Sequence, residues 1–322
     1  MNALIEQQAQ VADAMAGKRL DQVAAQLFPD FSRARLQAWI KDGSLTVNGT
    51  VCQPRHKLKG DEILSLSAHL TEQGDWLPES IDLECVYDDD HILILNKPSG
   101  LVVHPAAGNR SGTLLNALLN LYPSLVTVPR AGIVHRLDKD TTGLMVVAKT
   151  LAAHSHLVNQ LQERTLKREY EAVVQGVMTG GGTVEAPIGR HPKHRKKMAV
   201  TSNSGKEAIT HYRVIQRFQH HTHVRLQLET GRTHQIRVHM AHIHYPLVGD
   251  PVYGGRFKIP KGINPQLLDL LRYFSRQALH AAALGLVHPA SGEYLQWRVP
   301  VPKDMQGLLA QLSQSLADSC HE

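Results

Sequence analysis

The chain has 322 residues, a hydrophobic content of 42% and a formal net charge of +6, which suits about two globular domains with buried cores. It has no run of 18 apolar residues and no basic, apolar leader, and its three cysteines are far apart, which argues against a membrane-spanning helix, a signal peptide and a disulfide framework. We therefore expect a cytoplasmic protein without a membrane partner.

The charges are distributed unevenly along the chain. Residues 69–90 hold eight acidic residues and no Lys or Arg, whereas residues 91–322 hold 27 Lys and Arg against 14 Asp and Glu. A basic body of this size favours a polyanionic partner such as a nucleic acid. An inert basic surface would have the same composition.

Residues 1–68 are predicted to form a small N-terminal domain. Apolar residues recur twice with helical spacing before residue 43. Ser32 is a candidate N-cap for the second of these helices, which Gly43 ends. An Asn-Gly pair within residues 45–51 predicts a hairpin. The second helix also carries the basic residues Arg33, Arg35 and Lys41. This segment resembles an S4 RNA-binding domain, whose first two helices contact RNA, so the resemblance implies that these three residues bind RNA. A capped pair of surface helices is the alternative.

Residues 69–82 are predicted to form an acidic linker. The segment is polar and contains Gly74 and Pro78, which favour an irregular conformation. Its negative charge should keep it away from a polyanion and from the basic body, so we expect a mobile tether.

Residues 83–322 are predicted to form an α+β domain on a mixed, mainly antiparallel sheet. Strand-like segments outnumber helical ones, and short turns join many neighbours. The expected strands are residues 83–87, 92–95, 143–149, 168–174, 208–217, 223–229, 284–288 and 294–299. The expected helices are residues 114–121, 151–163, 233–242 and 305–316.

The most informative segment is residues 135–143, which read His-Arg-Leu-Asp-Lys-Asp-Thr-Thr-Gly and precede an apolar run. One carboxylate, Asp138, is flanked by Arg136 and Lys139 at the start of a predicted strand. Neighbouring cations favour the ionised carboxylate, which can act as a nucleophile or a general base. Taken alone, the segment also fits an ordinary loop salt bridge ahead of a buried strand.

Residues 135–143 resemble the catalytic motif H-R-L-D-x-x-T-[ST]-G of the RluA-type pseudouridine synthases. Residues 96–105, 168–174 and 230–239 resemble the family's other motifs in the same order, and the N-terminal domain resembles an S4 RNA-binding domain. Together these segments extend the resemblance over nearly the whole chain. It implies the pseudouridine synthase fold and an isomerase that converts uridine to pseudouridine in RNA.

The resemblance also implies roles for individual residues. Asp138 would attack the sugar or abstract its proton, and Arg237 would pair with it. Tyr170 would place its ring against the flipped uracil, and Arg136 would fill the space that the base leaves. Arg232 is expected to contact RNA. The plainer alternatives are a core tyrosine at Tyr170 and phosphate contacts at the three arginines.

Two further segments of this body are notable. Residues 190–197 hold five Lys and Arg in eight residues, so we expect an exposed hairpin or loop that clamps phosphates; a solvated charge run is the alternative. The candidate RNA-binding residues here are Lys193, Arg195, Lys196 and Lys197. Residues 246–251 resemble a family loop beside the pocket, and we assign no chemistry to them.

No cofactor and no metal are expected. The sequence lacks a glycine-rich phosphate loop and a serine-nucleophile elbow, and the isomerisation moves neither electrons nor phosphate groups. The histidines between His234 and His244 have Asp250 as their only nearby carboxylate, so RNA contacts and packing explain them better than zinc does.

Functions from different classes fit these observations. The leading one is an RNA-modifying isomerase, and the alternative is a non-catalytic ribosomal RNA-binding assembly factor. A metal-dependent nuclease is disfavoured by the lack of clustered carboxylates. Within the family the resemblance implies large-subunit ribosomal RNA as the partner, free or in pre-ribosomal particles, and we expect a monomer.

Overall fold

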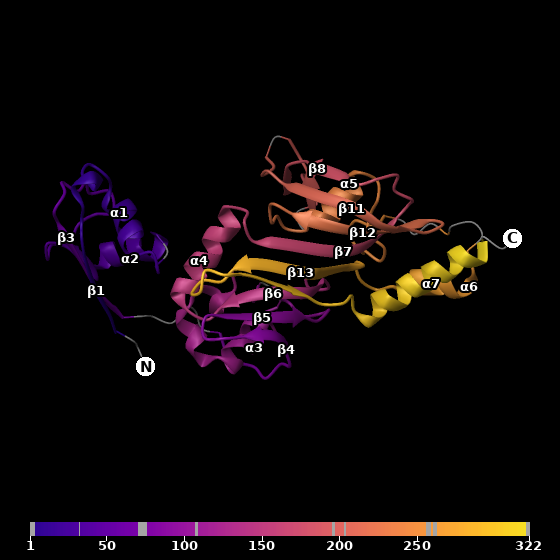
Figure 1. The fold of residues 1–322 in the computed structure, drawn as a ribbon, viewed down its shortest axis with the longest axis horizontal. Helices are drawn as coiled ribbons and strands as arrows, with labels where there is room; N and C mark the ends of the chain where they lie inside the picture. Colours follow the sequence, from indigo (N-terminus) through magenta and orange to yellow (C-terminus); the bar gives the residue numbers. More distant parts are fainter. Residues whose placement is uncertain are drawn as a thin grey trace.

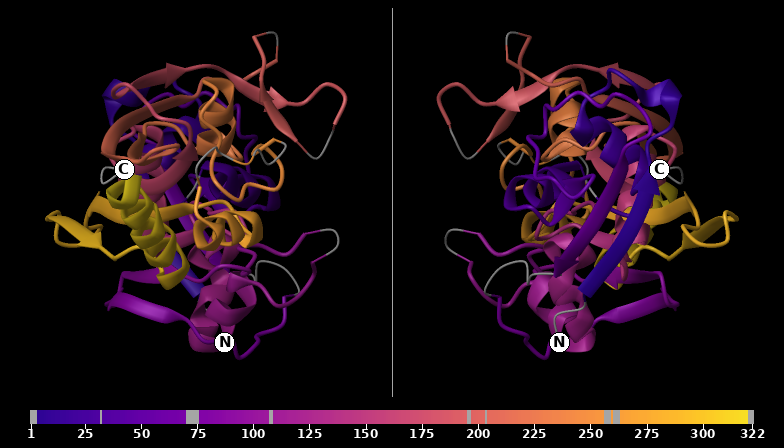
Figure 2. Two further views of the ribbon diagram at one scale, coloured as in Figure 1. Left: turned by 90° about the vertical axis from the view of Figure 1, so that its right-hand side faces the viewer. Right: turned by 90° about the vertical axis from the view of Figure 1, so that its left-hand side faces the viewer.

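The computed structural model describes residues 4–31, 33–69, 76–106, 109–194, 197–202, 204–255, 259 and 263–319. Within them the chain forms two parts with separate hydrophobic cores. The two parts lie end to end along the long axis of the molecule, with the smaller N-terminal part beside α4 of the larger body (Figures 1 and 2). The predicted α+β class on a mixed sheet is confirmed.

The N-terminal part packs two helices against a small antiparallel sheet with the strand order β1-β3-β2. Leu20, Leu36 and Ile40 are fully buried between these elements, as their helical spacing predicts. The bounds are β1 (Leu4–Gln10), α1 (Leu20–Leu27), α2 (Arg33–Asp42), β2 (Leu45–Val47) and β3 (Ile63–His69). Ser32 lies outside the described residues.

The predicted hairpin at residues 45–51 was only half right. Asn48 and Gly49 have φ angles of 48° and 78°, as a tight two-residue turn requires. After the turn, however, Thr50 makes only an isolated bridge to Val47. The partner of β2 is instead β3, a strand that the sequence analysis did not identify.

The expectation of a mobile tether was wrong for residues 76–82. The Trp76 side chain packs against the main core, and the Glu79 carboxylate accepts a hydrogen bond of 2.9 Å from the backbone N–H of Gly112. The Glu79 backbone N–H also donates to the Asn116 carbonyl in α3 (Leu114–Leu121). This part of the linker is held because its apolar and acidic side chains find partners on the body.

A mixed sheet forms the body, with the strand order β4-β5-β6-β13-β7-β12-β11-β8 and with β14 paired to β13. The β6–β13 pair is parallel and the other pairs are antiparallel. The bounds are β4 (Glu84–Asp88), β5 (Ile92–Lys97), β6 (Thr142–Ala148), β7 (Lys167–Gln175), β8 (Gly182–Glu185), β11 (Ile209–Arg217), β12 (His221–Leu228), β13 (Leu279–Val287) and β14 (Tyr294–Arg298).

Both faces of this sheet are covered. Leu93 and Leu95 of β5 belong to the core that contains α3, whereas Ile92 and Ile94 belong to the core under α4 (Leu151–Gln162). Alternate side chains of one strand thus serve two layers. No helix among the described residues is long and apolar enough to cross a membrane.

The predicted helices of the body are all present. Besides α3 and α4 they are α5 (Gln235–His242) and α7 (Lys303–Ser319). The elements that the sequence analysis did not identify in the body are α6 (Pro265–Tyr273) and the strands β8, β9 (Ile188–Arg190) and β10 (Met198–Val200). The β9–β10 hairpin spans the predicted basic loop.

Candidate active site

Asp138 lies in the loop that leads into β6. Its side chain is 18% exposed, while Leu137 before it is buried in the core and Arg136 is exposed. Arg136 and Asp138, on either side of the buried Leu137, both line one cavity. The backbone N–H of Thr141 donates to the Asp138 carbonyl and helps to close the turn.

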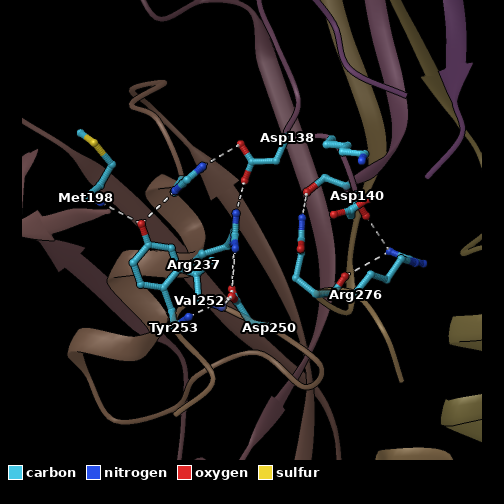
Figure 3. Close-up of polar contacts among 12 residues, drawn as sticks. Asp138, Asp140, Met198, Arg237, Asp250, Val252, Tyr253 and Arg276 are labelled. Carbon is cyan, nitrogen blue, oxygen red and sulfur yellow. Dashed lines mark hydrogen bonds and ion pairs between the residues drawn. The ribbon is translucent and has the colours of Figure 1, made fainter. Parts of the chain in front are cut away.

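The predicted ion pair between Asp138 and Arg237 is present. Arg237 lies on α5, and its Nη1 donates to Asp138 Oδ2 over 2.9 Å (Figure 3). This cation comes from 99 residues away in sequence. Within the described part of the chain, the sequence neighbours Arg136 and Lys139 form no ion pair with Asp138.

Arg237 is itself held by a second carboxylate that the sequence analysis missed. Its Nε and Nη2 donate to Oδ2 and Oδ1 of Asp250 over 2.7 and 2.9 Å (Figure 3). Burial raises the pKa of Asp250, but the hydrogen bonds and charge of Arg237 outweigh burial and leave that pKa below its ordinary value. The only signal in the sequence was a lone carboxylate in the apolar loop 246–251.

His234 and Tyr253 complete this cluster. His234, at a left-handed φ of 57°, places Nδ1 at 2.9 Å from the Tyr253 hydroxyl and Nε2 at 3.8 Å from Asp138 Oδ1. The same hydroxyl accepts a hydrogen bond from the backbone N–H of Met198 in β10. The Arg237 guanidinium lies over the Tyr253 ring at 5.1 Å. The hairpin that carries the basic loop is thus connected to the carboxylate site.

The side chain of Lys97 holds the loop that carries Asp138. It is fully buried, and its Nζ donates to the carbonyls of Pro98, Leu101 and Lys139 over 2.7 to 2.9 Å. Burial lowers the pKa of Lys97 to about 8, although the charges of Asp140 and Asp138 oppose this shift. Residues 96–105 therefore support residues 135–143 through one buried cation, Lys97.

Asp138 opens into a cavity of about 870 Å³, large enough for a nucleotide. Tyr170, on β7, lines it and is buried, and burial raises the pKa of its phenol. All five residues predicted around the target base line this cavity, namely Arg136, Asp138, Tyr170, Arg232 and Arg237. Three further arginines that the sequence analysis missed also line it, Arg130, Arg164 and Arg168.

The predicted RNA-binding residues of the N-terminal part lie elsewhere. Arg33 pairs with the buried Asp21 over 2.7 Å, and Arg35 donates to the Thr127 carbonyl of the body. Lys41 is exposed. Two of these three side chains therefore already have partners within the protein.

The predicted basic loop connects β9 and β10. Lys193 is exposed, whereas Lys197 Nζ donates to the Val252 carbonyl over 3.1 Å, in the segment that follows Asp250. Arg195 and Lys196 lie outside the described residues. Across the residues that the structure describes, no cluster of three or more His, Cys, Asp or Glu side chains has an arrangement that could hold a metal ion.

Comparisons with known proteins agree with this site. Residues 91–242 match the family model for RNA pseudouridylate synthase, and residues 18–64 match the S4 domain. The chain is 60% identical to ribosomal large subunit pseudouridine synthase D of Pseudomonas aeruginosa, over 98% of each chain. It is 56% identical to the protein of that name in Escherichia coli K12, over 94% of this chain and 92% of that one.

Solved structures give the same result. Human RNA pseudouridylate synthase domain containing 4 is similar with a TM-score of 0.56 and 26% identity, over 71% of this chain and 93% of that one. Human RNA pseudouridylate synthase domain containing 1 has a TM-score of 0.54 and 25% identity, over 73% of this chain and 95% of that one. The chain therefore belongs to the RluA-type pseudouridine synthases that carry an N-terminal S4 domain.

Proposed function

We propose that this chain isomerises specific uridines of large-subunit ribosomal RNA to pseudouridine, with Asp138 as the catalytic carboxylate. The observation that carries the proposal is one carboxylate, paired with a buried arginine, opening into a nucleotide-sized cavity that Tyr170 also lines. The names of the similar proteins of P. aeruginosa and E. coli support the choice of RNA.

The chemistry needs an ionised carboxylate beside the sugar. The bond between C1′ and N1 breaks, C1′ is joined to C5 of the same base, and the C5 proton is lost. Asp138 starts the cleavage by attacking the sugar or by removing its proton, and both routes use the ionised form. Arg237 favours that form because it hydrogen-bonds directly to Oδ2.

The target base must leave its stack to reach Asp138, because the carboxylate lies inside the cavity. Arg136, exposed at the edge of this cavity, fills the space that the base vacates. The Tyr170 ring lies against the flipped uracil.

The rest of the chain captures the RNA. Residues 1–68 act as the RNA-binding domain and residues 83–322 as the catalytic domain, joined by the acidic segment 69–82. Contacts with phosphates come from Arg232 and from the basic loop through Lys193, Arg195 and Lys196, whereas Lys197, which the sequence analysis placed in the same set, bonds to the Val252 carbonyl. We infer a monomer that works on cytoplasmic ribosomal RNA without a cofactor.

Replacing Asp138 tests the proposal. Asp138→Asn should abolish release of the C5 hydrogen from large-subunit ribosomal RNA that carries tritium at C5 of its uridines, while RNA affinity changes little. Asp269→Asn is the matched control, because Asp269 is exposed on α6 and does not line the cavity, and it should keep its activity. A near wild-type single-turnover rate in Asp138→Asn would contradict the catalytic role and favour an RNA-binding assembly factor.

A further inference from the structure

Arg168 is a buried cation for which no described residue supplies a counter-ion. Its side chain lies on β7 and lines the cavity of Asp138, with 7% of the residue exposed. One hydrogen bond is formed, from Nη2 to the Glu229 carbonyl over a long 3.3 Å. The buried Nε has no hydrogen-bond partner, and no described carboxylate forms an ion pair with the guanidinium.

The nearest acidic residues in sequence point the other way. Side chains alternate along a strand, so Arg168 and Tyr170 share the cavity side of β7 and Glu169 and Glu171 face the opposite side. There Glu169 pairs with Arg225 and Glu171 with His223. The charge of Arg168 therefore stays uncompensated on the cavity side.

Arg237, another buried cation that lines the cavity, differs from Arg168 because it has counter-ions. Arg237 is balanced by two carboxylates, Asp138 and Asp250. Burial lowers the pKa of Arg168, which reflects the cost of holding its charge away from water. An uncompensated buried charge destabilises a fold, and such groups concentrate at functional sites. The cavity is therefore suited to an electron-rich ligand beside Arg168.

The reaction itself generates such a group. When the bond between N1 and C1′ breaks, its electron pair leaves with the uracil, and the negative charge spreads over N1, O2 and O4. The charge is consumed when C5 bonds to C1′, which breaks the bond from Asp138 to C1′ on the first route and is accompanied by return of the abstracted proton from Asp138 to the sugar on the second; C5 then loses its proton and N1 gains one. This holds whether Asp138 attacks the sugar or abstracts its proton, so the base departs as an anion by either route.

We propose that the Arg168 guanidinium stabilises the uracil anion as the glycosidic bond breaks. The inference rests on the proposed function and adds a catalytic residue to it. Arg168, Tyr170 and Asp138 line the same cavity, and Arg168 and Tyr170 lie on the same side of β7. With the sugar of the target at Asp138 and the uracil against Tyr170, Arg168 is the cation of the cavity that is left to meet the base. A fixed cation beside developing charge favours the transition state over the bound substrate.

Arg168→Met tests this in the full-length protein with a large-subunit ribosomal RNA transcript as substrate. We expect kcat to fall by roughly 100-fold or more, with KM nearly unchanged. Thermal stability should stay level or rise, because the substitution removes an unpaired buried charge and keeps an apolar side chain of similar length. Arg168→Lys should recover part of kcat. In Arg168→Ala, added guanidinium at a non-denaturing concentration should restore turnover.

Arg225→Met is the matched control, since Arg225 lies on the adjacent strand β12 and pairs with Glu169 on the other face; its kcat should equal that of the wild type. A rise in KM at constant kcat would overturn the inference, because Arg168 would then bind only the ground state, for instance a phosphate. A large loss of thermal stability in Arg168→Met would overturn it as well, because the charge would then support the fold. Inactivity of the wild type on this RNA would instead refute the proposed function.

Discussion

A single guanidinium connects the two carboxylates of the candidate active site. Arg237 contacts Asp138 with one nitrogen and Asp250 with two. Asp250 in turn accepts from the backbone N–H groups of Val252 and Tyr253, each over 2.9 Å. Asp250 therefore fixes Arg237, and Arg237 fixes the carboxylate that we propose to be catalytic.

Asp250→Asn should lower kcat roughly 10- to 100-fold, because a small displacement of Arg237 misplaces Asp138, while KM for RNA should hardly change. The measurement is single-turnover kinetics at saturating RNA. Asp21→Asn is a matched control, since the buried Asp21 binds Arg19 through the same two-nitrogen geometry in the N-terminal part, away from the cavity. If both variants lose the same activity, the effect is one of general stability rather than of positioning.

A residue of this site could be predicted from the sequence when it lies in a motif that can be recognised by itself, but not when its role depends on contacts that only the fold creates. Asp138 and Arg237 lie in motifs that can be recognised individually, so their pairing could be expected. Asp250 could not be assigned a role, because nothing in linear spacing shows that its loop returns to α5. Arg168 was missed for a related reason: whether a buried arginine lacks a counter-ion depends on strand alternation and on neighbours far along the chain.

The prediction of secondary structure from the sequence was limited in the same way. Strands with an alternating pattern, such as β7 and β12, could be predicted within a few residues. The first half of β13 was missed, because this strand is buried on both faces from Leu279 to Leu286 and so lacks the alternation that marks a half-exposed strand. The predicted linker was misjudged because acidic composition suggested solvent exposure, although Glu79 has a backbone partner.

The tip and the base of the β9–β10 hairpin have different surroundings. Lys193 is exposed, whereas Lys197 holds the Val252 carbonyl near Asp250, and Met198 holds the Tyr253 hydroxyl. In the proposed function, the tip of the loop would offer cations to RNA, while its base supports the carboxylate site. Charges at the tip and at the base should therefore affect different steps.

Replacing Lys193, Arg195 and Lys196 together with Gln should weaken RNA binding and flatten its salt dependence by up to about one log–log unit for each phosphate that is no longer bound. Saturating RNA should then restore the turnover rate. Lys197→Met should instead lower the rate at saturation, since it frees the segment after Asp250. Affinity against salt, paired with single-turnover rates, separates the two. An unchanged slope in the triple variant would show that the loop tip is a solvated surface.

At the scale of the whole molecule, individual side chains of the described residues connect the two parts. Arg35 donates to the Thr127 carbonyl of the body, Ser155 of α4 donates to the Asp30 carbonyl, and Leu151 packs against the N-terminal core. Each part has its own buried core. We therefore expect these contacts to orient the S4-like part without being needed for the fold of the body.

Two truncations separate the linker from the domain. A chain that starts at Leu70 should fold and react at saturating RNA, but with weaker or less selective RNA capture, because it lacks the S4-like part and keeps Trp76 and Glu79. A chain that starts at Leu83 should melt at a lower temperature, because it also loses the Trp76 packing and the Glu79 hydrogen bonds to Gly112 and α3. Thermal melts and rates at limiting and saturating RNA give the comparison. Equal melting temperatures would mean that residues 76–82 do not stabilise the body. If the chain that starts at Leu70 kept the full rate at limiting RNA, the N-terminal part would not be needed to capture the substrate.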